Sequence, residues 1–393
     1  MILYVLHQLF VAESTLILNV LSFGDKPNGV TDSTQVFMDA WSAACASSDF
    51  STIRVPKGRY LLPTAIVFKG DNYKSPGITL RIYGTLVASF DYRILDQADN
   101  WLSFKTVIGV SIIGGALDTK GTSLWACKLA RSTDCPSEAT TQSLSFTNSK
   151  NIRIHGLMLL NSQMFHIVIN GCQDVNIQGV KITAAGNSPN TDGIHVQLSR
   201  NVAIFDTSIK TGDDCVNWPR HQRLVDRAHI VLGKDLEEEG VQNVTVKDAI
   251  FKGGQNCLRI KSWARPSHGF VQGVQFLDVV MLNVQIPIVI DQNCCPHNLN
   301  CPGQVSGVKV SDVLFRSIQG TSGTKIAINL DCSAANPCSG ITLENVSMIC
   351  KKQMAQSYCS NAIGKCGKYG RECFFLIMFL YKITRIYIHD TSV

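Results

Sequence analysis

The sequence lacks the features that mark membrane, zinc-binding and nucleic-acid-binding proteins. No apolar run reaches the roughly 18 residues of a membrane-spanning helix. No Cys-x-x-Cys pair and no Cys/His spacing resembles a zinc site. The 36 Lys and Arg residues are scattered, so the net charge of +6 suits an anionic partner but forms no basic cluster of the type that binds nucleic acid. With 12 Pro and 30 Gly in 393 residues, collagen-like and low-complexity chains are excluded too.

Cysteine is abundant, and it indicates an oxidising compartment. Fifteen cysteines are many for a cytosolic protein, where thiols stay reduced. The odd number leaves at least one thiol without a partner in the chain. Short separations suggest local bridges between Cys295 and Cys301 and between Cys332 and Cys338, although spacing alone does not determine connectivity. We therefore expect a secreted, disulfide-containing protein.

The chain divides into a long central body and two atypical ends. Residues 1–12 are apolar, but no positive charge precedes them and the residues that follow fit a cleavage site poorly. Residues 1–18 are thus interpreted as a weak signal peptide or an N-terminal extension, with a simple apolar first strand or helix as the alternative. We assign residues 19–358 to one domain and 359–393 to an atypical tail, although length alone would suggest two or three domains.

A short repeat overrides the estimate of domain number from length. Apolar residues alternate with other residues on both sides of a Gly, Asp or Asn, which predicts a strand interrupted by a bend. Successive Gly, Asp or Asn positions of the repeat, here called the marked positions, are 23 to 42 residues apart. Most of these gaps suit one coil of a solenoid, and the first gap of 42 residues has room for two coils. The marked positions are Gly114, Gly156, Gly179, Asp206, Asp248, Asp278, Asp312 and Asn345.

A second strand is predicted between the marks. Two strands per repeat with no helical periodicity favour a parallel β-helix over an antiparallel sandwich, which would need hairpin turns every 8–12 residues. In such a solenoid, residues one coil apart become neighbours at about 4.8 Å. The second strands are predicted at FHIVI from Phe165, GIHVQL from Gly193, CVNW from Cys215, LRIKS from Leu258, PIVID from Pro287 and KIAINL from Lys325.

Acidic and basic residues recur at equivalent places in successive coils. Asp192 precedes one predicted strand, and the pair Asp213 and Asp214 precedes the next. Arg259 and Lys261 lie two apart in a later strand, so alternation sends both to the same side. We expect these five side chains to meet in an open cleft, where two cations beside three carboxylates suit an acidic substrate. For an isolated Asp in a solenoid turn, a purely structural turn-forming role is the better interpretation.

The chain resembles plant polygalacturonases, a pectin-degrading family of glycoside hydrolases. The resemblance covers most of the sequence from about Asn19 to Cys350 and includes SPNTDGIHV, TGDDC, RIKSWARP and IVIDQN. It implies an all-β fold, a single right-handed parallel β-helix of the pectin-lyase-like type. It also implies inverting hydrolysis of α-1,4-linked galacturonan without a metal or an organic cofactor.

The resemblance also implies residue roles. Asp213 would be the general acid, Asp192 and Asp214 would hold and activate the water, and Arg259 and Lys261 would bind the substrate carboxylate. Crowding of three carboxylates would raise at least one pKa. His166 and His195 lie in predicted strands and are interpreted as packing or groove-lining residues.

The sequence departs from the family pattern in three places. The family's Gly-His-Gly, on the coil after the aspartate pair, is missing, and this stretch is about half a coil short; His229 and His221 are the local histidines, of which His229 is the candidate substitute. The family's partner for the cysteine after the aspartates is absent, so we expect Cys215 to be unpaired. Cys294 stands where the family has a subsite tyrosine.

These observations lead to one prediction and two rivals. The prediction is a monomeric, secreted cell-wall enzyme that hydrolyses pectin or polygalacturonate, with no nucleic-acid or membrane partner. The first rival is a catalytically impaired β-helix that still binds pectate, because the Gly-His-Gly coil is disrupted. The second is a calcium-dependent pectate lyase on a similar fold, which the absence of an evident set of Ca²⁺ ligands disfavours.

Overall fold

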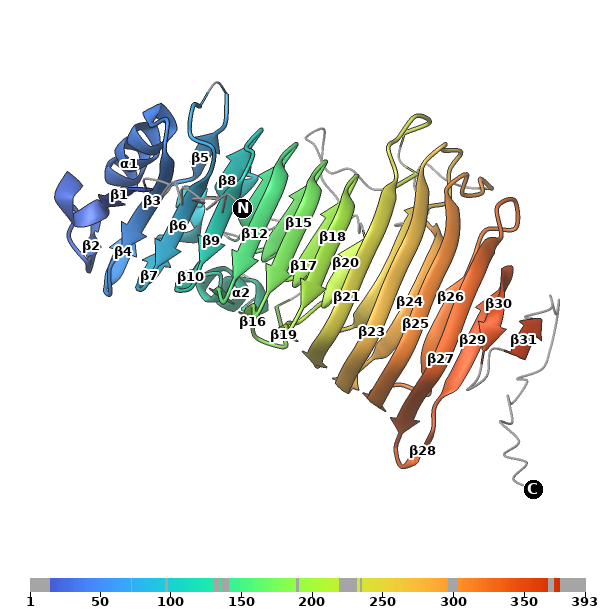
Figure 1. Cartoon of the computed structure of the whole chain (residues 1–393). Coiled ribbons are helices and arrows are strands. Elements are labelled where there is room, and N and C mark those ends of the chain that lie inside the picture. Colours follow the sequence, from blue (N-terminus) through green and yellow to red (C-terminus); the bar gives the residue numbers. More distant parts are fainter. Residues whose placement is uncertain are drawn as a thin grey trace, which may run out of the picture.

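The computed structural model describes residues 15–374, except 72, 96–97, 131–134, 136–140, 189–190, 219–231, 234, 296–302 and 367–370. Within these ranges the chain winds into an elongated stack in which each turn lies beside the previous one (Figure 1). The N-terminal strands lie at one end of the stack and the C-terminal strands at the other.

Ten of the described strands form one fully parallel sheet. Each is hydrogen-bonded to the equivalent strand of the next turn, in chain order from one end of the stack to the other. The strands are β5 (Ile66–Lys69), β8 (Asn100–Lys105), β11 (Gln142–Thr147), β14 (Ile167–Asn170), β17 (Ile194–Gln197), β20 (Val216–Trp218), β22 (Asn256–Trp263), β24 (Ile286–Cys294), β26 (Ile326–Asp331) and β29 (Gln356–Ser360).

Another 21 described strands form the second sheet, in which β28 and β31 are the antiparallel members among the described pairings. They are β1 (Thr15–Asn19), β2 (Asn28–Asp32), β3 (Phe50–Val55), β4 (Arg59–Leu61), β6 (Ile78–Ile82), β7 (Thr85–Val87), β9 (Val110–Ile113), β10 (Ala116–Asp118), β12 (Lys150–His155), β13 (Met158–Leu160), β15 (Gln173–Gln178), β16 (Lys181–Thr183), β18 (Arg200–Phe205), β19 (Ser208–Lys210), β21 (Val241–Lys252), β23 (Phe270–Val284), β25 (Lys309–Ser322), β27 (Cys338–Cys350), β28 (Gln353–Met354), β30 (Ala362–Cys366) and β31 (Arg371–Phe374).

The predicted parallel β-helix is confirmed, together with both sets of predicted strands. The six second strands are β14, β17, β20, β22, β24 and β26, consecutive members of the ten-stranded sheet. All eight marked Gly, Asp and Asn positions have a left-handed backbone, with φ from 51° at Asn345 to 71° at Gly114. Most L-residues avoid that conformation, whereas Gly, Asn and Asp tolerate it. The repeat in the sequence therefore records a bend that every coil must make.

Stacked aromatic rings show how equivalent positions line up inside the coils. Phe68, Phe104 and Phe146 belong to three successive strands of the ten-stranded sheet, and their ring centroids are 4.8 Å apart at each step. Phe276 and Phe315 stack in the same way at 5.0 Å. The core is thus a continuous apolar column. The alternate residues of the same strands point outward and are available to form a site.

Two helices interrupt the winding of the described chain. Helix α1 (Thr34–Ala46) places Phe37 and Trp41 against the first coils, where Trp41 contacts Phe68 and Phe104. The 3₁₀ helices are η1 (Val20–Phe23) and η2 (Tyr92–Leu95). Among the described residues, neither α-helix is long and apolar enough to cross a membrane.

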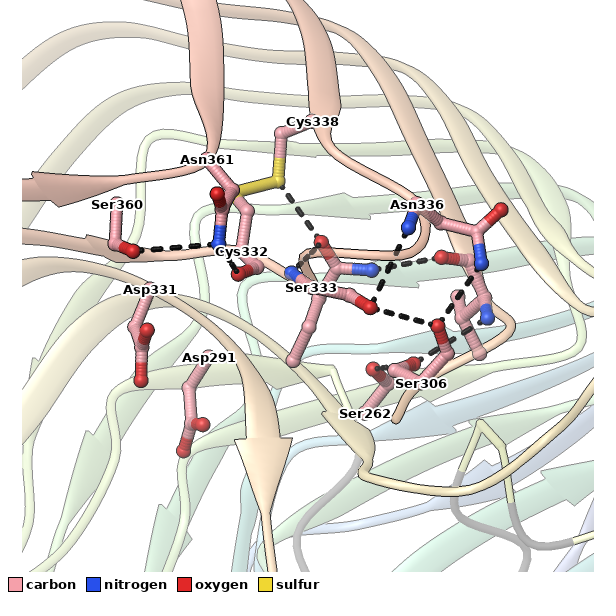
Figure 2. The surroundings of a disulfide bond; sticks show 12 residues. Ser262, Asp291, Ser306, Asp331, Cys332, Ser333, Asn336, Cys338, Ser360 and Asn361 are labelled. Carbon is pink, nitrogen blue, oxygen red and sulfur yellow. Dashed lines mark hydrogen bonds between the residues drawn. A yellow bond between two sulfur atoms is a disulfide. The ribbon is translucent and has the colours of Figure 1, made fainter. Parts of the chain in front are cut away.

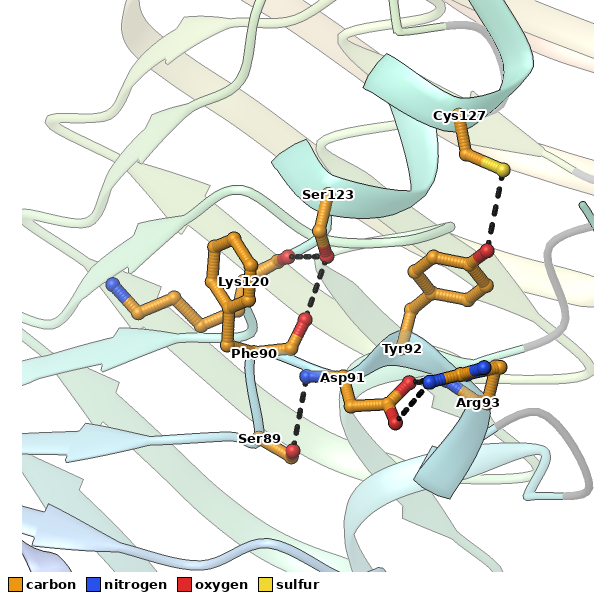
Figure 3. A network of polar contacts seen from close by, with 8 residues as sticks. All are labelled: Ser89, Phe90, Asp91, Tyr92, Arg93, Lys120, Ser123 and Cys127. Carbon is orange, nitrogen blue, oxygen red and sulfur yellow. Dashed lines mark hydrogen bonds and ion pairs between the residues drawn. The ribbon is translucent and has the colours of Figure 1, made fainter. Parts of the chain in front are cut away.

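Helix α2 (Thr122–Leu129) explains the first 42-residue gap. The strands on either side of the gap, β9 and β12, are direct neighbours, so it holds one coil with an inserted helix and not two coils. Figure 3 shows how the insert is fastened: Ser123 Oγ donates to the carbonyl of Phe90, and Tyr92 Oη donates to Cys127 Sγ at 3.2 Å.

The coil predicted to be half a turn short leaves both sheets continuous. Strand β20 pairs with β17 on one side and β22 on the other, and β18 pairs with β21. The aspartate pair before β20 therefore lies directly beside the strand that carries Arg259 and Lys261.

The disulfides confirm one expectation and correct another. Cys332 and Cys338 are bonded as predicted (Figure 2). Cys295 is disulfide-bonded, while its predicted partner Cys301 lies outside the described residues. The expectation that Cys215 is unpaired is wrong: it is bonded to Cys257, because register places these residues side by side on adjacent coils with Cα atoms 4.3 Å apart.

Candidate active site

Three neighbouring strands, β17, β20 and β22, bring together the five predicted site residues. The backbone N–H of Gly193 donates to the carbonyl of Asp214 at 2.9 Å, and Cys215 N–H donates to the carbonyl of Asn256 at 2.9 Å. These bonds place Asp192, Asp214 and Asn256 at equivalent positions on successive coils, about 4.8 Å apart at each step. The repeat spacing predicted the juxtaposition of Asp192 and Asp214, but not that of Asn256.

Asp214 is a carboxyl group whose two oxygens both accept hydrogen bonds. Oδ1 accepts from the backbone N–H of Asn256 at 3.2 Å and from its Nδ2 at 2.8 Å. Oδ2 lies 3.0 Å from Nη1 of Arg259. A side chain held only by donors presents an oriented acceptor, which suits a residue that orients or deprotonates water.

Arg259 is positioned between two carboxylates of the protein. Its Nη1 contacts Asp214, and its Nη2 lies 3.4 Å from Oδ2 of Asp291 on the following strand, β24. Burial alone would lower the pKa of Arg259, but the adjacent negative charges of Asp214 and Asp291 raise it overall. The guanidinium is therefore permanently charged and is held between Asp214 and Asp291, which lie on the coils on either side of it.

Lys261 lies on the same outward face as Arg259, as alternation predicted, while Ile260 between them belongs to the apolar core. Lys261 is only 5% exposed, and it makes no ion pair or hydrogen bond with residues that the structure describes. A buried ammonium group with no ion-pair partner among the described residues is well suited to bind a substrate carboxylate.

The backbone of Asp192 is held by His166, a connection that sequence reasoning missed. Both the backbone N–H of His166 and its Nδ1 lie within 3.0 Å of the carbonyl oxygen of Asp192. Its Nε2 accepts from the N–H of Ser162 at 3.4 Å, so the proton resides on Nδ1. Burial lowers the pKa of His166 to about 4, and hydrogen bonds to backbone carbonyls offset only part of this effect.

Asp213 is also fixed through its backbone. Its carbonyl accepts from Thr211 Oγ1 at 3.0 Å and from the N–H of Gln255 at 3.3 Å. Gly254 permits this close approach, because a Cβ there would lie 2.7 Å from the carbonyl oxygen of Asp213 and the backbone has a φ of +85°. The backbone at Asp213 is thus held from two sides, by Thr211 on its own coil and by Gln255 on the next coil.

His195 is the second histidine next to the site. Its ring stacks on Phe165 with centroids 4.7 Å apart, and its Nε2 is 3.1 Å from Oε1 of Gln197. In the sheet, His195 pairs with Asn217, which in turn pairs with Arg259. Packing and groove lining, the two roles predicted for His195, are both compatible with this position, where the residue stacks on Phe165 and is 3% exposed.

The predicted site residues that the structure describes are buried, and the open cleft expected around them stays a prediction. Asp192, Asp213 and Asp214 have no exposed surface, and Arg259, which is paired with Asp214 and Asp291, is 9% exposed. His229, the candidate substitute for the family's histidine, lies outside the described residues, as does His221. Cys294 is a half-buried free thiol, paired in register with Trp263. Among the described residues, no group of three or more His, Cys, Asp or Glu side chains is arranged to hold a metal ion.

Comparisons with known proteins show which family the chain belongs to. The family model described as "Glycosyl hydrolases family 28" matches residues 45–367. The polygalacturonase of Prunus persica is 51% identical over 366 residues, which cover 89% of this chain and 91% of that protein. Polygalacturonase-2 of Solanum lycopersicum is 37% identical over 349 residues, which cover 85% of this chain and 75% of that protein.

A solved structure supports the fold independently. The endo-xylogalacturonan hydrolase from Aspergillus tubingensis superimposes with a TM-score of 0.64 at 18% sequence identity, covering 92% of this chain and all of that one. This likeness establishes the fold class, the right-handed parallel β-helix that the sequence predicts.

Proposed function

Because the chain belongs to family 28 of the glycosyl hydrolases, we propose that it hydrolyses the α-1,4-galacturonosyl linkages of pectin and polygalacturonan. The observation that carries this proposal is the arrangement of five residues on three successive coils. Asp192 lies just before β17, Asp213 and Asp214 lie just before β20, and the cations Arg259 and Lys261 lie on β22. Membership of a hydrolase family disfavours the alternative of a pectate lyase, because a lyase cleaves by elimination and leaves an unsaturated product.

The carboxyl groups divide the work of an inverting hydrolysis. In this proposal Asp213 protonates the glycosidic oxygen, while Asp192 and Asp214 hold and activate the attacking water. The contacts of Asp214 support its part, because both of its oxygens already accept hydrogen bonds from Asn256 and Arg259. Inverting enzymes separate acid and base by roughly 6.5–9.5 Å to admit the water, and acids on one coil and its neighbour can span that range.

The cations have different parts in the proposal. Lys261 binds the carboxylate of the reacting sugar, because it has no anionic partner among the described residues. Arg259 mainly orients Asp214 and supplies a second positive charge to the substrate, because Asp214 and Asp291 already occupy its Nη1 and Nη2. This modifies the bidentate role implied by the resemblance alone.

The proposal includes location and partners. Described disulfides link Cys127 to Cys135, Cys215 to Cys257 and Cys332 to Cys338, which fits an oxidising compartment. The substrate is a cell-wall polysaccharide, so the enzyme would be secreted and act there as a monomer.

The test measures release of reducing ends from polygalacturonate by the secreted, disulfide-bonded protein. Asp213→Asn should lower kcat by about 10²–10⁴-fold with little change in KM, because a general acid acts mainly in the transition state. Asp278→Asn, at an exposed bend of the other sheet, is the matched control and should retain full activity. Proton NMR of the first product should show an inverted anomer. Binding of polygalacturonate by the wild-type protein without release of reducing ends would overturn the proposal in favour of a pectate-binding protein.

A further inference from the structure

One outward-facing row of the ten-stranded sheet changes its charge at the site. Each residue of this row is paired in register with the next one, on the neighbouring strand. Between Gln197 and Lys261 lies strand β20, whose residue in this row is outside the described residues. We call this the Lys261 row; it consists of Lys69, Lys105, Thr147, Asn170, Gln197, Lys261, Asp291, Asp331 and Ser360. Inward neighbours such as Phe104 and Ile290 belong to the core, so the row faces away from it.

The charged members of the Lys261 row are segregated by sign. On the N-terminal side of the site the charged members are Lys69 and Lys105, both exposed. On the C-terminal side they are Asp291 and Asp331. Figure 2 shows these two carboxyl groups side by side and pointing the same way from adjacent strands.

The two aspartates follow Lys261 directly in the row, on the next two strands. Register pairs Lys261 with Asp291, and Asp291 with Asp331. Asp291 is paired to Arg259 at 3.4 Å, whereas the Asp331 carboxylate accepts a hydrogen bond from Asn293 Nδ2 at 2.9 Å. Burial and the charge of Asp291 raise the pKa of Asp331, so this region already resists further negative charge.

We propose that the Lys261 row discriminates between charged and esterified sugars. This inference rests on the proposed function and deepens it. From the sugar bound at Lys261, the polyuronate extends over the N-terminal strands toward Lys105 and Lys69. The position over Asp291 and Asp331 disfavours a free uronate and accepts a neutral, methyl-esterified galacturonosyl residue. Asp291 is paired with Arg259, but Asp331 has no cation as a partner among the described residues, and the ester removes the charge that its carboxylate would repel.

The test compares two substrates at low salt with a chelator present, so that divalent cations cannot bridge carboxylates. One substrate is fully de-esterified polygalacturonate and the other is partly methyl-esterified pectin. Asp331→Asn keeps the size of the side chain and an acceptor for Asn293. It should raise kcat/KM for polygalacturonate about 3- to 10-fold and that for pectin less than 2-fold. Lys105→Gln should raise KM for polygalacturonate several-fold.

Controls carry the same charge changes to the other sheet. Asp278→Asn and Lys181→Gln alter exposed residues there and should leave the ratio of the two kcat/KM values unchanged. Ser360→Lys, at the next position of the row, is a second variant in case Asp331→Asn folds poorly. It should shift the ratio of the two kcat/KM values in the direction expected for Asp331→Asn. The shifts should shrink at 0.5 M NaCl, because screening weakens exposed charges.

The outcomes separate this inference from the proposed function. The discrimination proposal is wrong if the enzyme is active but Asp331→Asn and Ser360→Lys have the same ratio of kcat/KM for the two substrates as Asp278→Asn. If the wild-type protein releases no reducing ends from either substrate, the proposed function fails. The affinities of the same variants for the two polymers, measured by affinity electrophoresis, then decide the charge preference alone.

Discussion

At the residue scale, the site is organised by side chains that hold other side chains. Arg259 fixes Asp214 and Asp291, and His166 fixes the backbone of Asp192. Removal of one partner from a buried ion pair leaves an uncompensated charge, which typically costs about 3–5 kcal/mol. The orientation of the carboxylates therefore depends on neighbours that need not touch the substrate.

His166 provides a test of this dependence. His166→Asn places an amide N–H near the position of Nδ1 and should retain most of the activity, whereas His166→Leu should lower kcat about 10- to 100-fold by releasing the carbonyl of Asp192. KM should change less than kcat in both variants. Equal losses in His166→Asn and His166→Leu would show that His166 acts only by packing.

The same residue predicts how stability depends on pH. The pKa of His166 is about 4 in the folded protein and near 6.5 when unfolded, so the unfolded state binds more protons between these values. The stabilisation is complete above pH 6.5 and declines as pH falls toward 4, by about 3 kcal/mol for a shift of this size. Denaturant unfolding between pH 4 and 7 should show a flatter profile for His166→Asn than for the wild-type protein. Parallel profiles would contradict the assignment.

At the element scale, each coil depends on a bend that most L-residues resist. The marked residue of every repeat has a positive φ; it is Gly in the first three repeats and the tolerant Asp or Asn in the five that follow. Sequence periodicity was sufficient to locate these bends, because a local backbone requirement leaves a local signature. The inserted helix α2 was not predicted, because its residues lack a periodic pattern of their own.

Gly156 separates the backbone requirement from packing. Its φ is +64°, and a Cβ there would meet nothing within 4 Å. Gly156→Val should lower the free energy of unfolding by about 1–2 kcal/mol, because a β-branched residue is strained in this conformation, while Gly156→Asn should lose much less. Denaturant unfolding of both variants measures the difference. An equal loss in both would mean that space, not conformation, limits the position.

At the scale of the whole molecule, stacking converts distance in sequence into contact. Cys215 and Cys257 are 42 residues apart, but they are bonded because they occupy equivalent positions on adjacent coils. The Cys332–Cys338 bridge, in contrast, closes a loop within one coil, with a separation of 6 residues. The first bridge ties together the coils that carry the carboxylates and the cations.

The two bridges should differ in their effect on stability. By loop-closure entropy, removal of the first with Cys215→Ala and Cys257→Ala should lower the free energy of unfolding by about 4 kcal/mol, and removal of the second with Cys332→Ala and Cys338→Ala by about 2 kcal/mol. Activity should fall mainly in the first pair, because Cys215 follows Asp214 directly. The reverse order of stability losses, from denaturant unfolding of both double variants, would show that the local bridge matters more.

The sequence by itself determined the solenoid, the positions of its bends and the sets of residues that share a row, because each coil repeats a local pattern and stacking follows from the repeat. It also predicted that Asp192, Asp213, Asp214, Arg259 and Lys261 lie on neighbouring strands. Only the tertiary structure decided the pairing of Cys215 with Cys257, the direct contact of β20 with β22 and the burial of the five residues. These features depend on which coils are adjacent and on the way in which long side chains pack against neighbouring coils. A local sequence pattern encodes neither.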